Sequence, residues 1–227
     1  MAPFMENHQN KYRYERKYVL EQKDLHKFYL ELSKFYFFEL FPKRQINNLY
    51  LDTHTTDFFE ENVEGLYKRK KSRIRWYGSF SSLSNKTLEI KQKRGEVNFK
   101  EFLDLGDFEI TGETNLILLW DSIIKTEKNE SFIYVNNLQF LIPKLFNSYS
   151  REYYSNQDQS LRITIDKELK FLSPETNLNI HEKNVIIEFK YERDHVLNEN
   201  QFSNLKLNKY SKYVKGLLST TSFEPNY

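Results

Sequence analysis

The stretch RKKSRIRWYG, residues 69–78, carries a basic residue at every second position, namely Arg69, Lys71, Arg73 and Arg75. Side chains of a β-strand alternate between its two faces, so a strand formed here presents all of these charges on one face. Like charges packed so closely repel, and a strand whose face is simply in water gains nothing from such a row. The stretch therefore predicts a strand with one face turned toward a strongly anionic ligand.

The same alternation recurs in other strand-like stretches, with apolar residues on one face and charged residues, mostly basic, on the other. The charged faces hold Glu15 and Lys17, Glu89 and Lys91, Lys100, Tyr149 and Arg151, Arg162 and Asp166, and Glu188 and Lys190. In a single strand this pattern usually means that the charged face is in water. Repeated over several strands and rich in arginine, it favours a cationic face that the strands build together.

The spacing of these stretches predicts the fold class. Strands are expected over 11–20, 45–53, 71–78, 86–94, 98–105, 148–155, 161–169 and 184–192, and helices over 24–38, 57–64, 113–128, a short stretch after 131, and 211–219. Many strands with few helices favour an α+β protein of mainly antiparallel β-structure, a closed eight-stranded tunnel barrel with peripheral helices. We expect a single domain over 11–219, with flexible ends at 1–10 and 220–227.

Composition narrows the class of protein. The 227 residues include no cysteine, which excludes disulfides and thiolate metal sites and fits a reducing compartment. The net charge is only +2, from 34 basic and 32 acidic residues, which is low for a nucleic-acid-binding protein. No apolar run approaches the roughly 20 residues that span a bilayer. We therefore expect a cytoplasmic protein with no nucleic-acid partner and no membrane span of its own.

A buried cationic face needs a counter-anion, because burying unpaired Arg and Lys is costly. Polyphosphate or a nucleoside triphosphate meets that need, since Arg offers planar bidentate donors to phosphate oxygens and Lys supplies point charge. The carboxylates among the cations (Glu15, Glu89, Asp166 and Glu188) provide the oxygen ligands that Mg²⁺ or Mn²⁺ prefers. The five histidines are scattered at spacings that do not suggest a site.

Seven motifs in order carry a resemblance to a known family. They are YERKY at 14–18, the RxKxRxRxYG row at 69–78, LEIK at 88–91, SYSRxYY at 148–154, LRITID at 161–166, IIEFKY at 186–191 and KYSKYVKG at 209–216. Together they resemble the VTC-type polyphosphate polymerase domain of the triphosphate tunnel metalloenzyme (CYTH-like) superfamily, over about residues 11–219. The resemblance implies a tunnel of about eight antiparallel strands and ATP-dependent polyphosphate synthesis with a divalent metal, usually Mn²⁺.

Carried over position by position, the resemblance implies roles for individual residues. Those implied to bind triphosphate or polyphosphate are Lys17, Arg73, Arg75, Lys91, Lys100, Tyr149, Arg151 and Arg162, with Lys209, Ser211 and Lys212 at the start of the last helix. Glu188 stands at the metal-coordinating glutamate, with Glu15 and Asp166 as further candidates. Arg69, Lys71 and Lys190 join the set because they share the basic faces.

The resulting expectation is an enzyme that transfers the γ-phosphoryl group of ATP to a polyphosphate chain. One alternative is a tripolyphosphatase that uses the same tunnel with water as acceptor, and another is a module that binds polyphosphate without turnover. Related tunnel hydrolases and cyclases begin with Glu-x-Glu-x-Lys, whereas this chain has Arg13 in the first glutamate position. This departure argues against the hydrolase and cyclase branch. Any membrane partner that carries the product across a bilayer is left open.

Overall fold

The structure is a computed structural model that describes residues 13–95, 97–192 and 202–221. The expected flexible N-terminus at 1–10 and residues 222–227 of the expected tail at 220–227 lie outside these ranges. Thr220, the first residue of the expected tail, is the last residue of a helix and is buried. No helix in the described part of the chain is long and apolar enough to cross a membrane.

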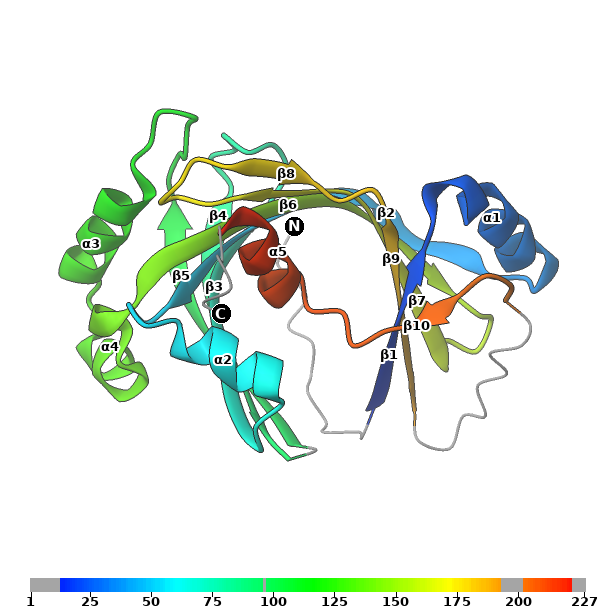
Figure 1. The fold of residues 1–227 in the computed structure, drawn as a ribbon, viewed down its shortest axis with the longest axis horizontal. Coiled ribbons are helices and arrows are strands. Elements are labelled where there is room, and N and C mark those ends of the chain that lie inside the picture. Colours follow the sequence, from blue (N-terminus) through cyan, green and yellow to red (C-terminus); the bar gives the residue numbers. More distant parts are fainter. Residues whose placement is uncertain (1–12, 96, 193–201, 222–227) are drawn as a thin grey trace, which may run out of the picture. The chain divides into compact units, whose positions relative to one another are not determined.

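The described chain is α+β and mainly antiparallel β, as expected. Its strands are β1 (Arg13–Leu20), β2 (Phe38–Asp52), β3 (Lys68–Tyr77), β4 (Asn85–Arg94), β5 (Val97–Asp107), β6 (Ile142–Ser155), β7 (Leu161–Leu172), β8 (Asn179–His181), β9 (Val185–Glu192) and β10 (Lys206–Leu207) (Figure 1). Its helices are α1 (Leu25–Lys34), α2 (Asp57–Glu64), α3 (Leu116–Thr126), α4 (Glu130–Asn136) and α5 (Lys212–Thr220), with 3-10 turns at Gln22–Asp24 and Leu138–Phe140.

The sheet corrects one expectation. All ten strands form one sheet in the order β10-β1-β9-β7-β6-β2-β3-β4-β5, with β8 paired to β7 beside this path. Strands β10 and β5 are its two ends, and within the described ranges no ladder joins them. In the described part of the chain the strands therefore form an open sheet rather than the expected closed eight-stranded barrel. Strand β10 has only two residues, both paired to β1, which offers too few backbone groups to close a barrel.

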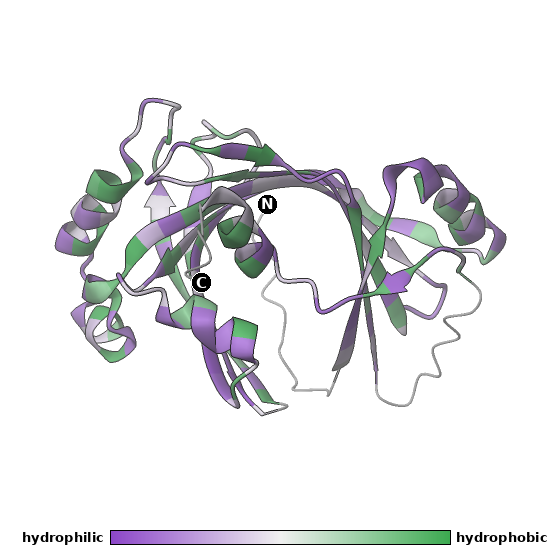
Figure 2. Ribbon diagram, viewed as in Figure 1, coloured by the Kyte–Doolittle hydropathy of each residue, from purple (hydrophilic) through white to green (hydrophobic). Residues whose placement is uncertain are grey.

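The chain divides into two compact units, each described by itself. Unit 1 comprises residues 1–43, 151–167 and 184–210, and unit 2 comprises 44–150, 168–183 and 211–227. In unit 1, antiparallel ladders join β1 to β9 and β9 to β7. Their apolar face, including Tyr18, Ile163 and Ile187, packs against Phe28 and Leu32 of α1. Figure 2 shows hydrophobic and hydrophilic residues alternating along this helix, as the 3.6-residue period of an amphipathic helix requires.

Unit 2 is built in the same way on its own core. Leu49, Ile74 and Trp76 of β2 and β3 pack with Trp120 of α3 and other apolar residues of β4, α2 and the segment before β6. Helix α2 has its expected bounds and ends at Gly65, whose φ of 71° is the left-handed conformation of a C-terminal cap. In both units the apolar face of the sheet is covered by helices, so the opposite face holds the charged residues.

Candidate functional site

Strand β3 presents the basic row as the sequence predicts. Ser72, Ile74 and Trp76 are buried in the apolar layer, whereas Arg73 and Arg75 lie half-buried on the other face. Antiparallel ladders join β3 to β4 and β4 to β5. The basic face is therefore continued by strands on which charged and apolar residues also alternate.

A row of lysines crosses three adjacent strands of unit 2. Lys71 of β3 lies opposite Lys91 of β4, and Lys91 lies opposite Lys100 of β5. Directly opposed like charges destabilise a sheet. Such a row is favourable once an anion lies across it, because the anion turns repulsion between the lysines into attraction.

One row further along the strands, an acid holds the two central arginines. Glu89 Oε2 accepts from Arg73 Nε at 2.7 Å and from Nη2 at 2.5 Å, and Glu89 Oε1 lies 3.4 Å from Arg75 Nη1. Burial alone would raise the pKa of Glu89, but the positive charges of Arg73 and Arg75 outweigh it and lower that pKa below its ordinary value. Glu89 is therefore an ionised counter-charge that orients both guanidinium groups.

Residues of β2 complete this arrangement, although the sequence-based set did not include them. Asn48 Oδ1 accepts from Arg75 Nε at 2.9 Å, and the Tyr50 hydroxyl lies 3.5 Å from Arg73 Nη1. Both residues stand opposite those arginines in the β2–β3 ladder. The alternation of polar Asn48 and Tyr50 with buried Leu49 and Leu51 carries the signal that would have found them.

The N-terminus of α5 meets the lysine row. Ser211 caps the helix, its Oγ accepting from the backbone N–H of Val214, and the same Oγ accepts from Lys71 Nζ at 2.9 Å. Lys212 Nζ lies 4.5 Å from the centre of the Tyr149 ring. The helix dipole disfavours cations at this end and favours anions. Two lysines at a helix N-terminus therefore indicate an anion-binding site.

Unit 1 has a cationic face of its own, in which each described acid is engaged by a base. Arg151 forks onto Asp166, with Nε at 2.5 Å from Oδ1 and Nη2 at 2.7 Å from Oδ2. Lys190 Nζ lies 2.9 Å from Glu188 Oε1, and Arg162 stands opposite Lys190 in the β7–β9 ladder. This face therefore places two arginines, a lysine and two carboxylates on adjacent strands.

The pKa of Glu188 is strongly perturbed. Burial would raise its pKa, but the charges of Lys190, Lys17 and Arg151 outweigh burial and hold the pKa well below its ordinary value of 4.5. Lys17 stands directly opposite Glu188 in the β1–β9 ladder, and its Nζ lies 3.2 Å from Glu15 Oε1. Glu188 is therefore a buried carboxylate that stays ionised.

Comparison with known proteins decides the family. The model of the VTC domain matches residues 12–221, nearly the whole chain. The chain belongs to the VTC domain family. A comparison with curated proteins gives no match.

A solved structure shares the fold of this VTC domain at low sequence identity. An adenylyl cyclase candidate from Hippeastrum, described as having a dominant triphosphatase activity, is 15% identical, with a TM-score of 0.50 over 91% of this chain and 96% of that one. An adenylate cyclase candidate from Vibrio parahaemolyticus is 14% identical, with a TM-score of 0.49 over 93% of this chain and 100% of that one.

The candidate residues of the VTC domain separate by position. Arg73, Arg75, Lys71, Lys91, Lys100, Tyr149, Ser211 and Lys212 lie in unit 2, and Lys17, Arg151, Arg162, Lys190, Glu188, Glu15, Asp166 and Lys209 lie in unit 1. Arg69 departs from the rest of its row, since its Nη1 donates to the backbone oxygens of Gly65 and Leu66 at 3.4 and 2.9 Å. Arg69 therefore braces the turn between α2 and β3. Lys209 is exposed in the segment before α5.

Glu188 is a better candidate for a metal ligand than Asp166. No group of three or more His, Cys, Asp or Glu residues suited to a metal ion occurs within the described ranges. Both oxygens of Asp166 already accept from Arg151, whereas Glu188 is ionised and engaged by Lys190 through one oxygen. Mg²⁺ commonly uses one or two carboxylates together with substrate phosphates and water. The residues present therefore fit a divalent cation that arrives with phosphate.

A cavity of about 820 Å³ in unit 1 has a different character. Its lining includes Tyr29, Tyr36 and Tyr154, with Glu152 and Lys167 paired to each other at its polar side. Tyr29 donates to Glu152 and accepts from Lys167. Paired charges among aromatic rings do not suit phosphate, so the basic faces remain the candidate site.

Proposed function

We propose that this VTC domain is an ATP-dependent polyphosphate polymerase, which transfers the γ-phosphoryl group of ATP to the end of a polyphosphate chain. The observation that carries the proposal is in unit 2, where the lysine row reaches the N-terminus of α5 through the contact between Lys71 and Ser211. Arg73 and Arg75 stand one and two rows further along the same face of β3. Such a set of donors suits several phosphates in succession better than a single one.

The chemistry needs little beyond positioning and charge. An oxygen of the terminal phosphate attacks the γ-phosphorus of ATP in line, the bond from that phosphorus to the β–γ bridging oxygen breaks, and ADP leaves with that oxygen. The basic side chains hold both reactants and stabilise the charge on the transferred group. No side chain is required as a covalent nucleophile.

A divalent cation, Mn²⁺ or Mg²⁺, would supply additional positive charge to the phosphate oxygens. Glu188 is the residue proposed to hold it. The role of Lys17, Arg151 and Arg162 is then to bind phosphate oxygens, while Lys190 and Lys17 keep Glu188 ionised and Arg151 stays oriented by Asp166.

One assay tests the function. Purified protein is incubated with ATP and Mn²⁺, and long-chain polyphosphate, ADP and free phosphate are measured. We expect polyphosphate and ADP to accumulate in step with each other. Free phosphate released from tripolyphosphate in a parallel incubation would instead indicate a hydrolase, and binding without turnover would indicate a polyphosphate-binding module. The variant Lys125→Ala, which removes an exposed charge on α3, is the control and should behave as wild type.

A further inference from the structure

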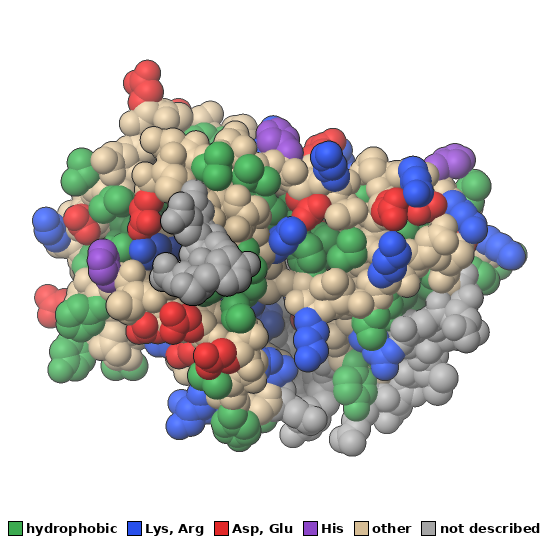
Figure 3. Space-filling model, viewed as in Figure 1, with side chains coloured by type: hydrophobic (Ala, Val, Ile, Leu, Met, Phe, Trp, Pro, Cys, Tyr) green, Lys and Arg blue, Asp and Glu red, His purple; other side chains and the backbone are tan. Residues whose placement is uncertain are grey.

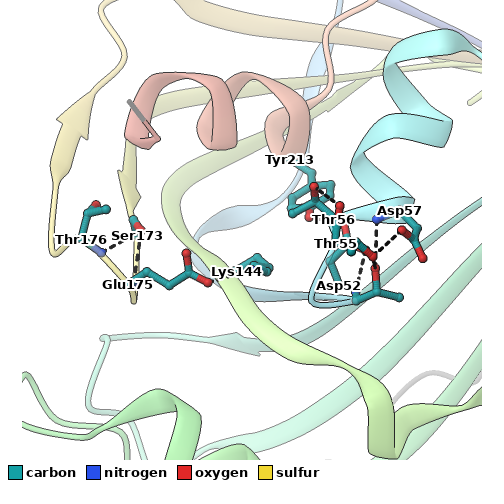
Figure 4. Close-up of polar contacts among 10 residues, drawn as sticks. Asp52, Thr55, Thr56, Asp57, Lys144, Ser173, Glu175, Thr176 and Tyr213 are labelled. Atoms are coloured by element: carbon teal, nitrogen blue, oxygen red, sulfur yellow. Dashed lines mark hydrogen bonds and ion pairs between the residues drawn. The ribbon is translucent and has the colours of Figure 1, made fainter. Parts of the chain in front are cut away.

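The N-terminal end of α5 is fixed by one buried contact that the proposed function does not include. The Tyr213 hydroxyl donates to Asp52 Oδ2 at 2.5 Å, and both residues are almost fully buried. Figure 4 shows this contact between the first turn of α5 and the end of β2. Tyr213 follows Ser211 and Lys212 directly, so the contact fixes the part of the helix that carries them.

Asp52 also organises the start of α2. Its Oδ1 accepts from the N–H groups of Thr53 at 2.7 Å and Phe58 at 2.9 Å, and its Oδ2 accepts from the N–H of Phe59 at 2.9 Å. Thr56, the N-cap residue of α2, makes no side-chain cap. Asp52 therefore satisfies the N–H groups of Phe58 and Phe59 in α2 while it accepts from Tyr213, and it joins the starts of two helices.

Each hydrogen-bond donor to Asp52 is important because this acid is buried. No basic side chain forms an ion pair with Asp52 within the described ranges. Burial raises the pKa of Asp52, and the hydrogen bonds from Tyr213 and the backbone act in the opposite direction. A buried carboxylate without a cation depends on its hydrogen bonds. Asp52 therefore holds the Tyr213 hydroxyl in one place.

Packing leaves α5 little freedom to move. Tyr213 stacks on Tyr50, with ring centroids 5.0 Å apart. One turn later, a Cβ added to Gly216 would lie 2.5 Å from a Leu145 methyl and 2.6 Å from the Phe171 ring. The helix is thus pressed onto the sheet at Gly216, and the Tyr213–Asp52 hydrogen bond sets how its first turn is placed.

We propose that Tyr213 and Asp52 are positioning residues for phosphate binding, which act through Ser211 and Lys212. This inference rests on the proposed function, because it assumes that the N-terminus of α5 receives a phosphate group. The hydrogen bond keeps Ser211 within reach of Lys71, so that the helix N–H groups and both lysines meet the same anion. Neither Tyr213 nor Asp52 touches the phosphate itself.

The test is a titration of tripolyphosphate into Tyr213→Phe, which keeps the ring and removes only the hydroxyl. We expect the dissociation constant to rise about tenfold, the lower end of what is seen when a group that orients a ligating residue is lost. The matched control is Thr176→Val, which removes the hydroxyl that donates to Thr220 O at the other end of α5. This control should bind as wild type.

A double-mutant cycle separates positioning from a general loss of stability. In a Lys212→Ala background, Tyr213→Phe should weaken binding much less than it does in wild type, because its effect passes through the same turn. Full additivity would overturn the proposal. If wild type itself does not bind tripolyphosphate, the proposed function fails. If wild type and Tyr213→Phe bind equally, only the positioning role fails.

Hydrogen exchange on wild type tests the proposal even if Tyr213→Phe does not fold. Tripolyphosphate should slow exchange of the first-turn amides of α5 and also of the Phe58 and Phe59 amides, since Asp52 links the two helices. Slower exchange in α5 with no change at Phe58 and Phe59 would contradict the link.

Discussion

Arg73 and Arg75 lie two residues apart on one face, yet the fold holds them differently. Arg73 makes two hydrogen bonds to Glu89, whereas Arg75 donates Nε to Asn48 and has its Nη1 3.4 Å from Glu89 Oε1. Removal of Arg73 leaves the acid without its main partner. Arg75 is the residue whose remaining donors suit a ligand.

The two arginines should therefore respond differently to alanine substitution. Arg73→Ala should lower the free energy of unfolding of the ligand-free protein by about 1–3 kcal/mol, the cost of leaving a half-buried charged group unsatisfied. Arg75→Ala should change that stability less but should weaken tripolyphosphate binding and reduce the thermal shift that the ligand gives. Melting curves of both variants, with and without tripolyphosphate, check this. A large loss of stability in Arg75→Ala with an undiminished ligand shift would assign Arg75 a purely structural role.

The lowered pKa of Glu188 predicts how the stability of the protein depends on pH. Its pKa is lowered in the folded protein, so its contribution to stability is complete above its ordinary pKa of 4.5 and is lost as pH falls toward the folded value. Glu188→Gln should therefore flatten the acid side of the stability curve below about pH 4.5 and abolish Mn²⁺-dependent turnover, while tripolyphosphate still binds. Denaturant unfolding at a series of pH values measures the first effect. An acid limb as steep as that of wild type would show that Glu188 is not the perturbed acid.

At the scale of elements, the sequence predicts best where one face is apolar and the other charged. β3, β4, β7 and β9 have this pattern and were predicted within a few residues, as was α2 with its Gly65 cap. β6 begins at Ile142 rather than 148, because residues 143–147 are buried on both faces and show no alternation. The helix expected over 24–38 ends at Lys34, since the apolar stretch after it fits a helix and a strand equally well.

Of the candidate site, the phase of the basic rows could be predicted, but their partners could not. Alternation places Arg73 and Arg151 on a charged face, whereas their pairing with Glu89 and Asp166 depends on the register of neighbouring strands. The role of Asp52 could not be predicted from the sequence either, because it depends on a contact with Tyr213, which is distant along the chain.

The end of α1 yields a prediction at this scale. Tyr36 has a φ of 58°, and its N–H bonds back to Ser33 O while Phe37 N–H bonds to Leu32 O, the pattern of a helix that usually ends in glycine. Tyr36→Gly should therefore raise the free energy of unfolding by about 1 kcal/mol, as the cost of a left-handed residue is relieved. Tyr36→Ala, which removes the ring but keeps that cost, is the control. Equal stability of the two variants in denaturant unfolding would show that the left-handed conformation of residue 36 does not limit stability.

At the scale of the whole molecule, a near-neutral net charge conceals strong segregation of charge. The chain carries +2 overall, while basic residues line one face of the sheet in each unit and Asp57, Glu60, Glu61 and Glu64 lie on α2. Figure 3 shows acidic side chains gathered over this helix. Binding of an anion at the basic faces should therefore depend on local charge and on salt rather than on the net charge.

The most direct measurement of the central claim is calorimetric titration of tripolyphosphate into wild type and into a variant with Lys71, Lys91 and Lys100 all changed to alanine. We predict that wild type binds, that affinity falls as salt rises, and that the triple variant binds far more weakly. Lys125→Ala should bind as wild type. Equal affinity of the triple variant and wild type would contradict the claim that the basic face of unit 2 is the phosphate-binding site.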